Sequence, residues 1–246
     1  MENMINGLID INALESFTTI YKELSKYRDL GCKGVVLGLS GGKDSTVVAM
    51  LAKLIWGDNV LGVIMPNKSR DGVEDARTIA KYLDLETREV CISDAYDNIV
   101  SVGASDAAAI NIAPRLRMTV LYTIAQTLGY RVIGTGNRSE RFIGWCTKFG
   151  DMACDINPIA HLTCTEVIHM GACICNFFGL PTKYVNIPPA DGLTGRTDEE
   201  NFGFTYEQLD NFLLKGSSGD PVLDKRIIGM HDRARHKLQM PITFEK

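Results

Sequence analysis

The chain has 246 residues, of which 45% are hydrophobic and 23% are charged, and its formal net charge at pH 7 is −4. A chain of this length buries roughly 70–75% of its unfolded surface, so it needs no disulfide or structural metal for stability. The acidic balance argues against a nucleic-acid backbone as the main partner. We therefore expect a single globular domain over residues 1–246, with no nucleic-acid partner.

The seven cysteines are odd in number and include no CxxC pair, and the first residues lack the basic region of a signal peptide. The longest weakly charged stretch covers only residues 167–181, which is too short to cross a bilayer. These features predict a cytoplasmic protein that has free thiols and no membrane association.

Five His and Cys side chains between residues 161 and 175 raise the alternative of a zinc or iron–sulfur site. Two of them are four residues apart and would share a helix face. The other spacings match no familiar metal frame, and the apolar residues between them are typical of a buried helix. We expect packed thiols here; the five residues are His161, Cys164, His169, Cys173 and Cys175.

Strands and helices alternate in the first half of the chain. Residues 35–39 form a continuous apolar run, which is typical of a strand buried on both faces. Such alternation predicts an α/β fold in which helices flank a doubly wound parallel sheet. Further strands are expected at 60–65, 88–92 and 131–134, and helices at 9–30, 44–56, 73–83 and 107–128, with Pro114 marking a start or a kink in the last.

The pattern after residue 134 is richer in loops. Helices are expected near residues 165–178, 205–215 and 221–237. Residues 190–200 (ADGLTGRTDEE) are polar and contain glycine, which predicts a mobile loop.

Residues 40–45 (SGGKDS) follow the first expected strand directly and open a helix. The two glycines allow a sharp turn, and Ser40, Ser45 and backbone N–H groups could donate to phosphate oxygens at the positive end of the helix. Leu37 and Asp44 do not match a Walker A loop. The Asp44 carboxylate would repel a phosphate unless a divalent cation lay between them, which predicts Mg²⁺. The alternative is a simple turn in which Asp44 caps the helix.

The hexapeptide SGGKDS resembles the SGGxDS loop of the N-type ATP pyrophosphatases, which split ATP between the α and β phosphates and adenylate a substrate oxygen. A second block, residues 134–158, follows the fourth expected strand, where open α/β sheets bind ligands. Its GTGNRSE, TKFGD, Asp155 and Pro158 closely resemble the pattern GTxNxxE…TKxGD…D…P of NAD synthetases. Segments 111–118, 198–210 and 236–241 resemble that family in the same order, so the resemblance runs from about residue 10 to the end.

The resemblance implies roles for the matching residues. It places Mg²⁺ on Asp44 and Glu140, and ATP on Gly38, Leu39, Ser40, Gly41, Gly42, Lys43, Asp44, Ser45 and Thr135. It places deamido-NAD, partly across a homodimer interface, on Arg115, Lys148, Asp155, His236 and Lys237. A mainly basic set suits a pyrophosphate and a nicotinate carboxylate, although any one of these charges alone is also compatible with a solvated surface.

The resemblance also implies a two-step reaction. The nicotinate carboxylate attacks the α phosphorus of ATP and expels pyrophosphate, and ammonia then attacks the adenylate to give NAD and AMP. Catalysis rests on Asp44 with its cation, and Asp155 could receive or orient ammonia. Glutamine-using NAD synthetases carry a separate amidase domain, for which 246 residues leave no room. We therefore expect free ammonia, or ammonia delivered by a partner, as the nitrogen source.

Several positions depart from the family pattern. Cys164 stands where the family usually has a lysine that contacts ATP phosphates, and Pro189 where it has a hydroxyl residue. Leu238 follows His236 and Lys237 where the family has arginine, and Arg196 replaces a loop glutamine. Our hypothesis is that Arg196 supplies the missing positive charge.

Two other functions remain open at this point. One is a relative of the same fold that adenylates another acid or transfers sulfur, which would need an exposed, low-pKa thiol near the loop, with Cys164 as the candidate. The other is a non-catalytic nucleotide-binding protein. Asp44 and Glu140 argue against the latter, because a dead site has no use for two opposed carboxylates.

Overall fold

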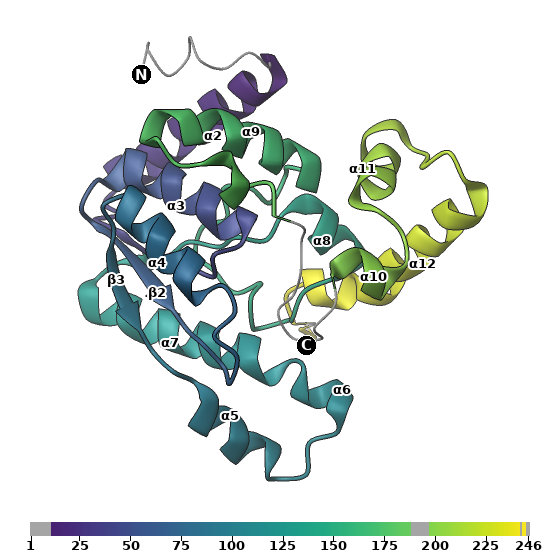
Figure 1. Ribbon diagram of the computed structural model, residues 1–246. Helices are drawn as coiled ribbons and strands as arrows, with labels where there is room; N and C mark the ends of the chain where they lie inside the picture. Colours follow the sequence, from purple (N-terminus) through teal and green to yellow (C-terminus); the bar gives the residue numbers. More distant parts are fainter. Residues whose placement is uncertain (1–10, 188–196, 242, 245–246) are drawn as a thin grey trace.

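The computed structural model describes residues 11–187, 197–241 and 243–244. In these ranges, the strands β1 (Val35–Gly38), β2 (Val60–Ile64), β3 (Glu86–Glu89) and β4 (Arg131–Val132) form a sheet in the order β3-β2-β1-β4 (Figure 1). Every pairing is parallel, and Val35 lies opposite both Val60 and Arg131. The predicted parallel α/β sheet is confirmed.

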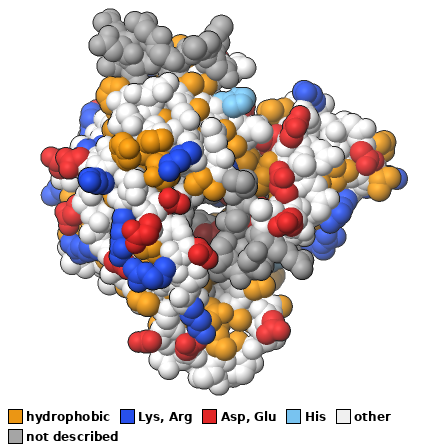
Figure 2. Space-filling model, in the orientation of Figure 1, with side chains coloured by type: hydrophobic (Ala, Val, Ile, Leu, Met, Phe, Trp, Pro, Cys, Tyr) orange, Lys and Arg blue, Asp and Glu red, His pale blue; other side chains and the backbone are white. Residues whose placement is uncertain are grey.

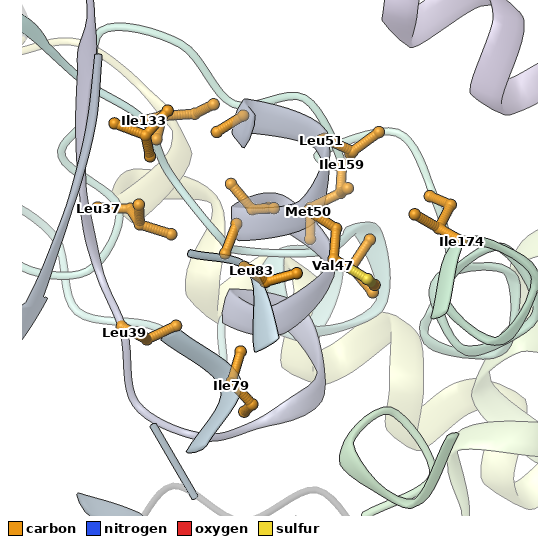
Figure 3. Close-up of a cluster of buried hydrophobic side chains, with 14 of the residues drawn as sticks. Leu37, Leu39, Val47, Met50, Leu51, Ile79, Leu83, Ile133, Ile159 and Ile174 are labelled. Carbon is orange, nitrogen blue, oxygen red and sulfur yellow. The ribbon is translucent and has the colours of Figure 1, made fainter. Parts of the chain in front are cut away.

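Helices cover both faces of the sheet because side chains alternate along its strands. Val35 and Leu37 of β1 belong to one buried cluster, and Val36 between them belongs to another. The first cluster packs beneath α2 (Ile11–Asp29), α3 (Lys43–Trp56), α4 (Val73–Tyr82) and α9 (Cys164–Phe178). Figure 3 shows Leu37 from the sheet and Met50 and Leu51 from α3 within it. The second lies under α5 (Ser93–Val100) and α7 (Ile112–Leu128).

A third cluster joins the later helices to the sheet layer. It includes Ile143, Phe202, Leu209 and Ile227, which come from four different helices. On the face in Figure 2, a hollow opens between the sheet part and these helices. The helices are α8 (Arg138–Ile143), α10 (Asp198–Phe202), α11 (Tyr206–Lys215) and α12 (Pro221–Leu238). A 3₁₀ turn, η1 (Thr182–Tyr184), lies between α9 and α10.

The structure differs from the expected elements at a few places. The third strand is Glu86–Glu89 rather than residues 88–92. The long helix is broken into α6 (Asp106–Ala109) and α7, and Pro114 lies in the first turn of α7, where its missing N–H costs nothing. The short helices α5, α8 and α10 were not expected. Of the predicted mobile loop, residues 190–196 lie outside the described residues, and residues 198–200 belong to helix α10 instead of a loop because Thr197 and Glu200 form a capping box.

All seven cysteines are free, as expected. None of the helices in the described ranges is both long enough and apolar enough to span a membrane.

Candidate active site

The phosphate loop lies between the end of β1 and the start of α3, as predicted. Gly41 has a φ of +85°, and a Cβ atom there would lie 2.5 Å from the carbonyl oxygen of Gly72. The loop is closed by its own hydroxyl groups, since the Oγ atoms of Ser40 and Ser45 are 3.0 Å apart and Ser45 donates to the carbonyl of Gly42 at 2.9 Å. Hydrogen bonds within the loop therefore fix its conformation at the positive end of a helix before any ligand binds.

Asp44 and Glu140 reach the same place from neighbouring strand ends. Asp44 is the second residue of α3, which follows β1, and Glu140 is the third residue of α8, which follows β4. The fully buried Asn137 joins them, because its amide donates to Asp44 Oδ1 at 3.2 Å and its Oδ1 accepts from the backbone N–H of Glu140 at 3.0 Å. The pair predicted from two separate motifs is brought together.

The side chain of Lys43 lies between these two carboxylates. Its Nζ is 2.6 Å from Asp44 Oδ2 and 3.8 Å from Glu140 Oε1, and the side chain is 3% exposed. Burial alone would lower the pKa of Lys43, but attraction by Asp44 and Glu140 outweighs it and raises that pKa. The site therefore favours the charged form of Lys43.

Glu140 is destabilised as a carboxylate. Burial, followed by repulsion from Asp44, raises the pKa of Glu140 to about 8, and Lys43 offsets this only in part. Two carboxylates that need a cation between them fit a hard divalent ion such as Mg²⁺. No group of three His, Cys, Asp or Glu side chains in the described part of the chain could hold a metal. A cation bound by Asp44 and Glu140 would therefore take its other ligands from phosphate oxygens or water.

A second layer of side chains holds Lys43 and α8 in place. The ring of Tyr206 lies 5.6 Å from Lys43 Nζ, and its hydroxyl donates to Asp198 at 2.8 Å. Trp145 donates to the other oxygen of Asp198 at 3.0 Å. This chain of contacts connects the phosphate loop with α10 and α11.

Cys164 is near the loop but is no reactive thiol. It is 1% exposed, and burial raises its pKa, with Lys43 offsetting that rise only in part. The sulfur-transfer alternative, which required an exposed, low-pKa thiol at Cys164, is therefore wrong. Of the other cysteines in this segment, Cys175 is buried and Cys173 is partly buried, which agrees with the packed thiols expected from the sequence.

Asp155 lies in a separate pocket. Its Oδ2 accepts from the backbone N–H of Val132 at 2.8 Å, on the edge of β4. The pocket has a volume of about 220 Å³, and no residue of the phosphate loop lines it. Burial, followed by the charge of Asp155, raises the pKa of Tyr122 to about 12. The lining residues are Tyr122, Ala125, Gln126, Tyr130, Arg131 and Asp155.

The C-terminal basic residues bind the backbone of the protein. Lys237 Nζ donates to the carbonyl oxygens of Gly144 and Cys146, each at 2.8 Å. Lys148 Nζ donates to the carbonyl oxygen of His236 at 2.6 Å. These bonds tie the end of α12 to the segment after α8, so the structure brings Lys148, His236 and Lys237 together.

The remaining predicted residues lie in different places. Arg115 is exposed on the first turn of α7, and Thr135 is half-buried three residues after the end of β4. Pro189 and Arg196 lie outside the described residues.

Some residues of the site were not predicted as functional. Asn137 could have been found, because Asn followed three residues later by Glu is a helix-start signal. The tertiary fold alone brings together Tyr206, Asp198 and Trp145, so their contacts could not be predicted from the sequence. The sequence pattern around Tyr122 indicates only an aromatic side chain on a partly buried helix face.

Comparison with known proteins is consistent with this geometry. An NH₃-dependent NAD⁺ synthetase of Finegoldia magna is 41% identical over 220 residues, covering 87% of this chain and 88% of the relative. The structure of an NMN synthetase from Francisella tularensis has a TM-score of 0.86 and 32% identity, covering 96% of this chain and 100% of that one. An NH₃-dependent NAD synthetase from Campylobacter jejuni, solved with nitrate, has a TM-score of 0.76 and 27% identity over 96% and 100% of the two chains. The family model for NAD synthase matches residues 14–241, and this chain therefore belongs to the NAD synthase family.

Proposed function

We propose that this protein amidates deamido-NAD with free ammonia at the expense of ATP, through an adenylated intermediate, and releases NAD, AMP and pyrophosphate. The observation that carries the proposal is the pair Asp44 and Glu140 beside the SGGKDS loop, at adjacent strand ends of a member of the NAD synthase family. The use of free ammonia is supported by curated relatives of similar length that are named NH₃-dependent NAD⁺ synthetases.

The phosphate loop would bind and orient the triphosphate. Its backbone N–H groups lie at the start of α3, and Ser40 and Ser45 can exchange their mutual hydrogen bond for bonds to phosphate oxygens. Mg²⁺ held by Asp44 and Glu140 would neutralise the charge that develops on the leaving pyrophosphate. No protein nucleophile is required, because alignment and charge stabilisation supply the rate enhancement.

The pocket at Asp155 would take part of the second substrate. Two tyrosine side chains, Arg131 and Asp155 line it, which suits an aromatic ring with polar substituents. Asp155 accepts a backbone hydrogen bond from Val132 and a side-chain hydrogen bond from Tyr122, and its carboxylate oxygens have lone pairs left that could accept from a ribose hydroxyl or from ammonia. Exposed Arg115 and the basic cluster of Lys148, His236 and Lys237 would meet the substrate's phosphates.

A second substrate, nicotinate mononucleotide, is supported by one observation. The NMN synthetase structure superposes on this chain with a higher TM-score than the Campylobacter jejuni NAD synthetase, 0.86 against 0.76. Both reactions would use the same loop, cation and ammonia. The two substrates would differ only in how much of the protein's substrate-binding surface each one covers.

A product assay tests both substrates. The enzyme is incubated with ATP, Mg²⁺ and ammonium, and with either deamido-NAD or nicotinate mononucleotide. We expect the amide, AMP and pyrophosphate in equal amounts, with the larger kcat/KM for deamido-NAD. Pyrophosphate without either amide would point to another acid substrate, and the absence of every product would sink the proposal. Glutamine in place of ammonium should give no amide.

We further propose that the protein acts as a cytoplasmic homodimer. The resemblance to NAD synthetases, in which the second substrate contacts both subunits, supports the dimer, and the seven free thiols fit a reducing compartment. Light scattering coupled to gel filtration would reveal the dimer, and a monomeric mass at working concentrations would contradict it.

A further inference from the structure

Lys43 is a loop residue whose charged end is bound inside the protein. Its backbone belongs to the phosphate loop, yet its side chain is 3% exposed and its ammonium group contacts Asp44 Oδ2 at 2.6 Å. Glu140 Oε1 is 3.8 Å away, and the ring of Tyr206 lies 5.6 Å from the same nitrogen. The ammonium ion is thus the direct counterion of Asp44 and lies within ion-pair distance of Glu140.

This position is the one that a divalent cation would need. Mg²⁺ binds carboxylate oxygens directly at about 2.0–2.1 Å, and Asp44 Oδ2 is already engaged by Lys43. Two cations that share one carboxylate oxygen in a partly buried site repel each other strongly. Lys43 and a divalent cation therefore compete for the same two side chains.

The ring of Tyr206 favours the inward position of the ammonium group. The face of an aromatic ring attracts a cation, and this ring is fixed because its hydroxyl donates to Asp198, which also accepts from Trp145. The alternative partner for Lys43 is a phosphate group on the loop that carries it. The complex of ATP with a divalent cation supplies both a metal ion and such a phosphate.

We propose that Lys43 is an internal counterion that competes with free divalent cations for the Asp44–Glu140 site. The metal displaces the ammonium group only when it binds together with a nucleotide polyphosphate, and the ammonium group then contacts the phosphates. The nucleotide half of this proposal rests on the proposed function, whereas the competition between Lys43 and the metal does not. The consequence is that free Mg²⁺ binds poorly and that the metal enters as its ATP complex.

Calorimetric titration of Mn²⁺ alone into the metal-free protein tests the competition directly. Lys43→Met removes the charge and keeps the length of the side chain, and we expect Mn²⁺ alone to bind at least about tenfold more tightly than to the wild type. Metal-bound ATP should bind at least about tenfold more weakly, because a phosphate contact is lost. Lys53→Met is the matched control, since Lys53 is on the same helix and pairs with Asp58 and the carbonyl of Asp84, and it should change neither affinity.

Lys43→Gln provides a second variant if Lys43→Met does not fold, because it retains a hydrogen-bond donor while removing the charge. Mn²⁺ should also raise the melting temperature of either variant more than that of the wild type. Unchanged or weaker Mn²⁺ binding in the Lys43 variants would overturn the proposal. Since neither readout requires deamido-NAD or turnover, this result stands apart from the identity of the substrate.

Discussion

The two halves of the candidate active site are built differently. At the carboxyl ends of β1 and β4, Asp44, Lys43, Asn137 and Glu140 bind one another directly and are largely buried. The predicted substrate residues instead lie on the exposed face of α7, in a small pocket at the sheet edge, and at the end of α12.

The metal and phosphate region is preorganised, whereas the residues predicted to bind the second substrate are spread over separate parts of the structure. Glu140 and Asp44 are fixed before any ligand arrives, so a change there should affect the chemical step. Lys148 and Lys237 donate to backbone carbonyl groups, so their first role in this chain is to hold α12 in place. Changes there should act on substrate affinity or on stability.

Asp44→Asn should have the largest effect. The amide keeps the size of the side chain but removes the charge that would bind the cation, and we expect kcat to fall roughly 10³-fold. Steady-state rates of pyrophosphate release measure this. Asp58→Asn, at a side chain that is 96% exposed on the loop after α3, serves as the control and should be silent. A loss of less than about tenfold would remove Asp44 from the proposed metal site.

Arg196→Ala tests the charge that we expect from the loop. If Arg196 contacts the polyphosphate, its removal should lower turnover about 10²-fold, the scale of one preorganised charge contact. An unchanged rate would contradict a role for Arg196 and would leave Lys43 as the candidate positive charge for the ATP phosphates. Lys183→Ala, at an exposed lysine of η1, is a suitable control.

Glu140→Gln should lower the activity and make the melting temperature less dependent on pH. The pKa of Glu140 is raised to about 8 in the folded protein, so this carboxyl holds its proton more tightly there than in the unfolded chain. Its contribution to stability is complete below the ordinary pKa of 4.5 and is lost as pH rises through about 8. In the presence of a chelator, the melting temperature of the wild type should fall over this range, and Glu140→Gln should reduce the fall. Parallel melting curves would contradict this assignment.

Lys237→Met and Arg115→Ala should separate stability from binding. Lys237→Met leaves two carbonyl groups without their donor and should reduce the free energy of unfolding by about 1–3 kcal/mol, measured by urea denaturation. Arg115→Ala should leave unfolding unchanged and raise the KM for the dinucleotide about tenfold. An equal loss of stability in both variants would remove the contrast between them.

The parts of the molecule that follow from local rules were predictable from the sequence. Apolar runs gave the strands around Val35 and Val60, and the SGGKDS loop gave Asp44, whereas Glu140 came from the resemblance to NAD synthetases. The contact between Lys43 and Tyr206 was not predictable, because it joins residues far apart in the chain whose separate patterns indicate only a loop and a helix. The short helices α5, α8 and α10 were also missed, since they offer too few turns for a periodic pattern.

The chemical claim at the centre of this account is that a carboxylate oxygen of the substrate attacks the α phosphorus of ATP. Deamido-NAD labelled with ¹⁸O in its nicotinate carboxylate tests this directly, with the products analysed by phosphorus NMR and mass spectrometry. We predict that each amidation transfers one ¹⁸O atom to the phosphate of AMP and none to pyrophosphate. NAD formation without label in AMP would contradict the adenylated intermediate.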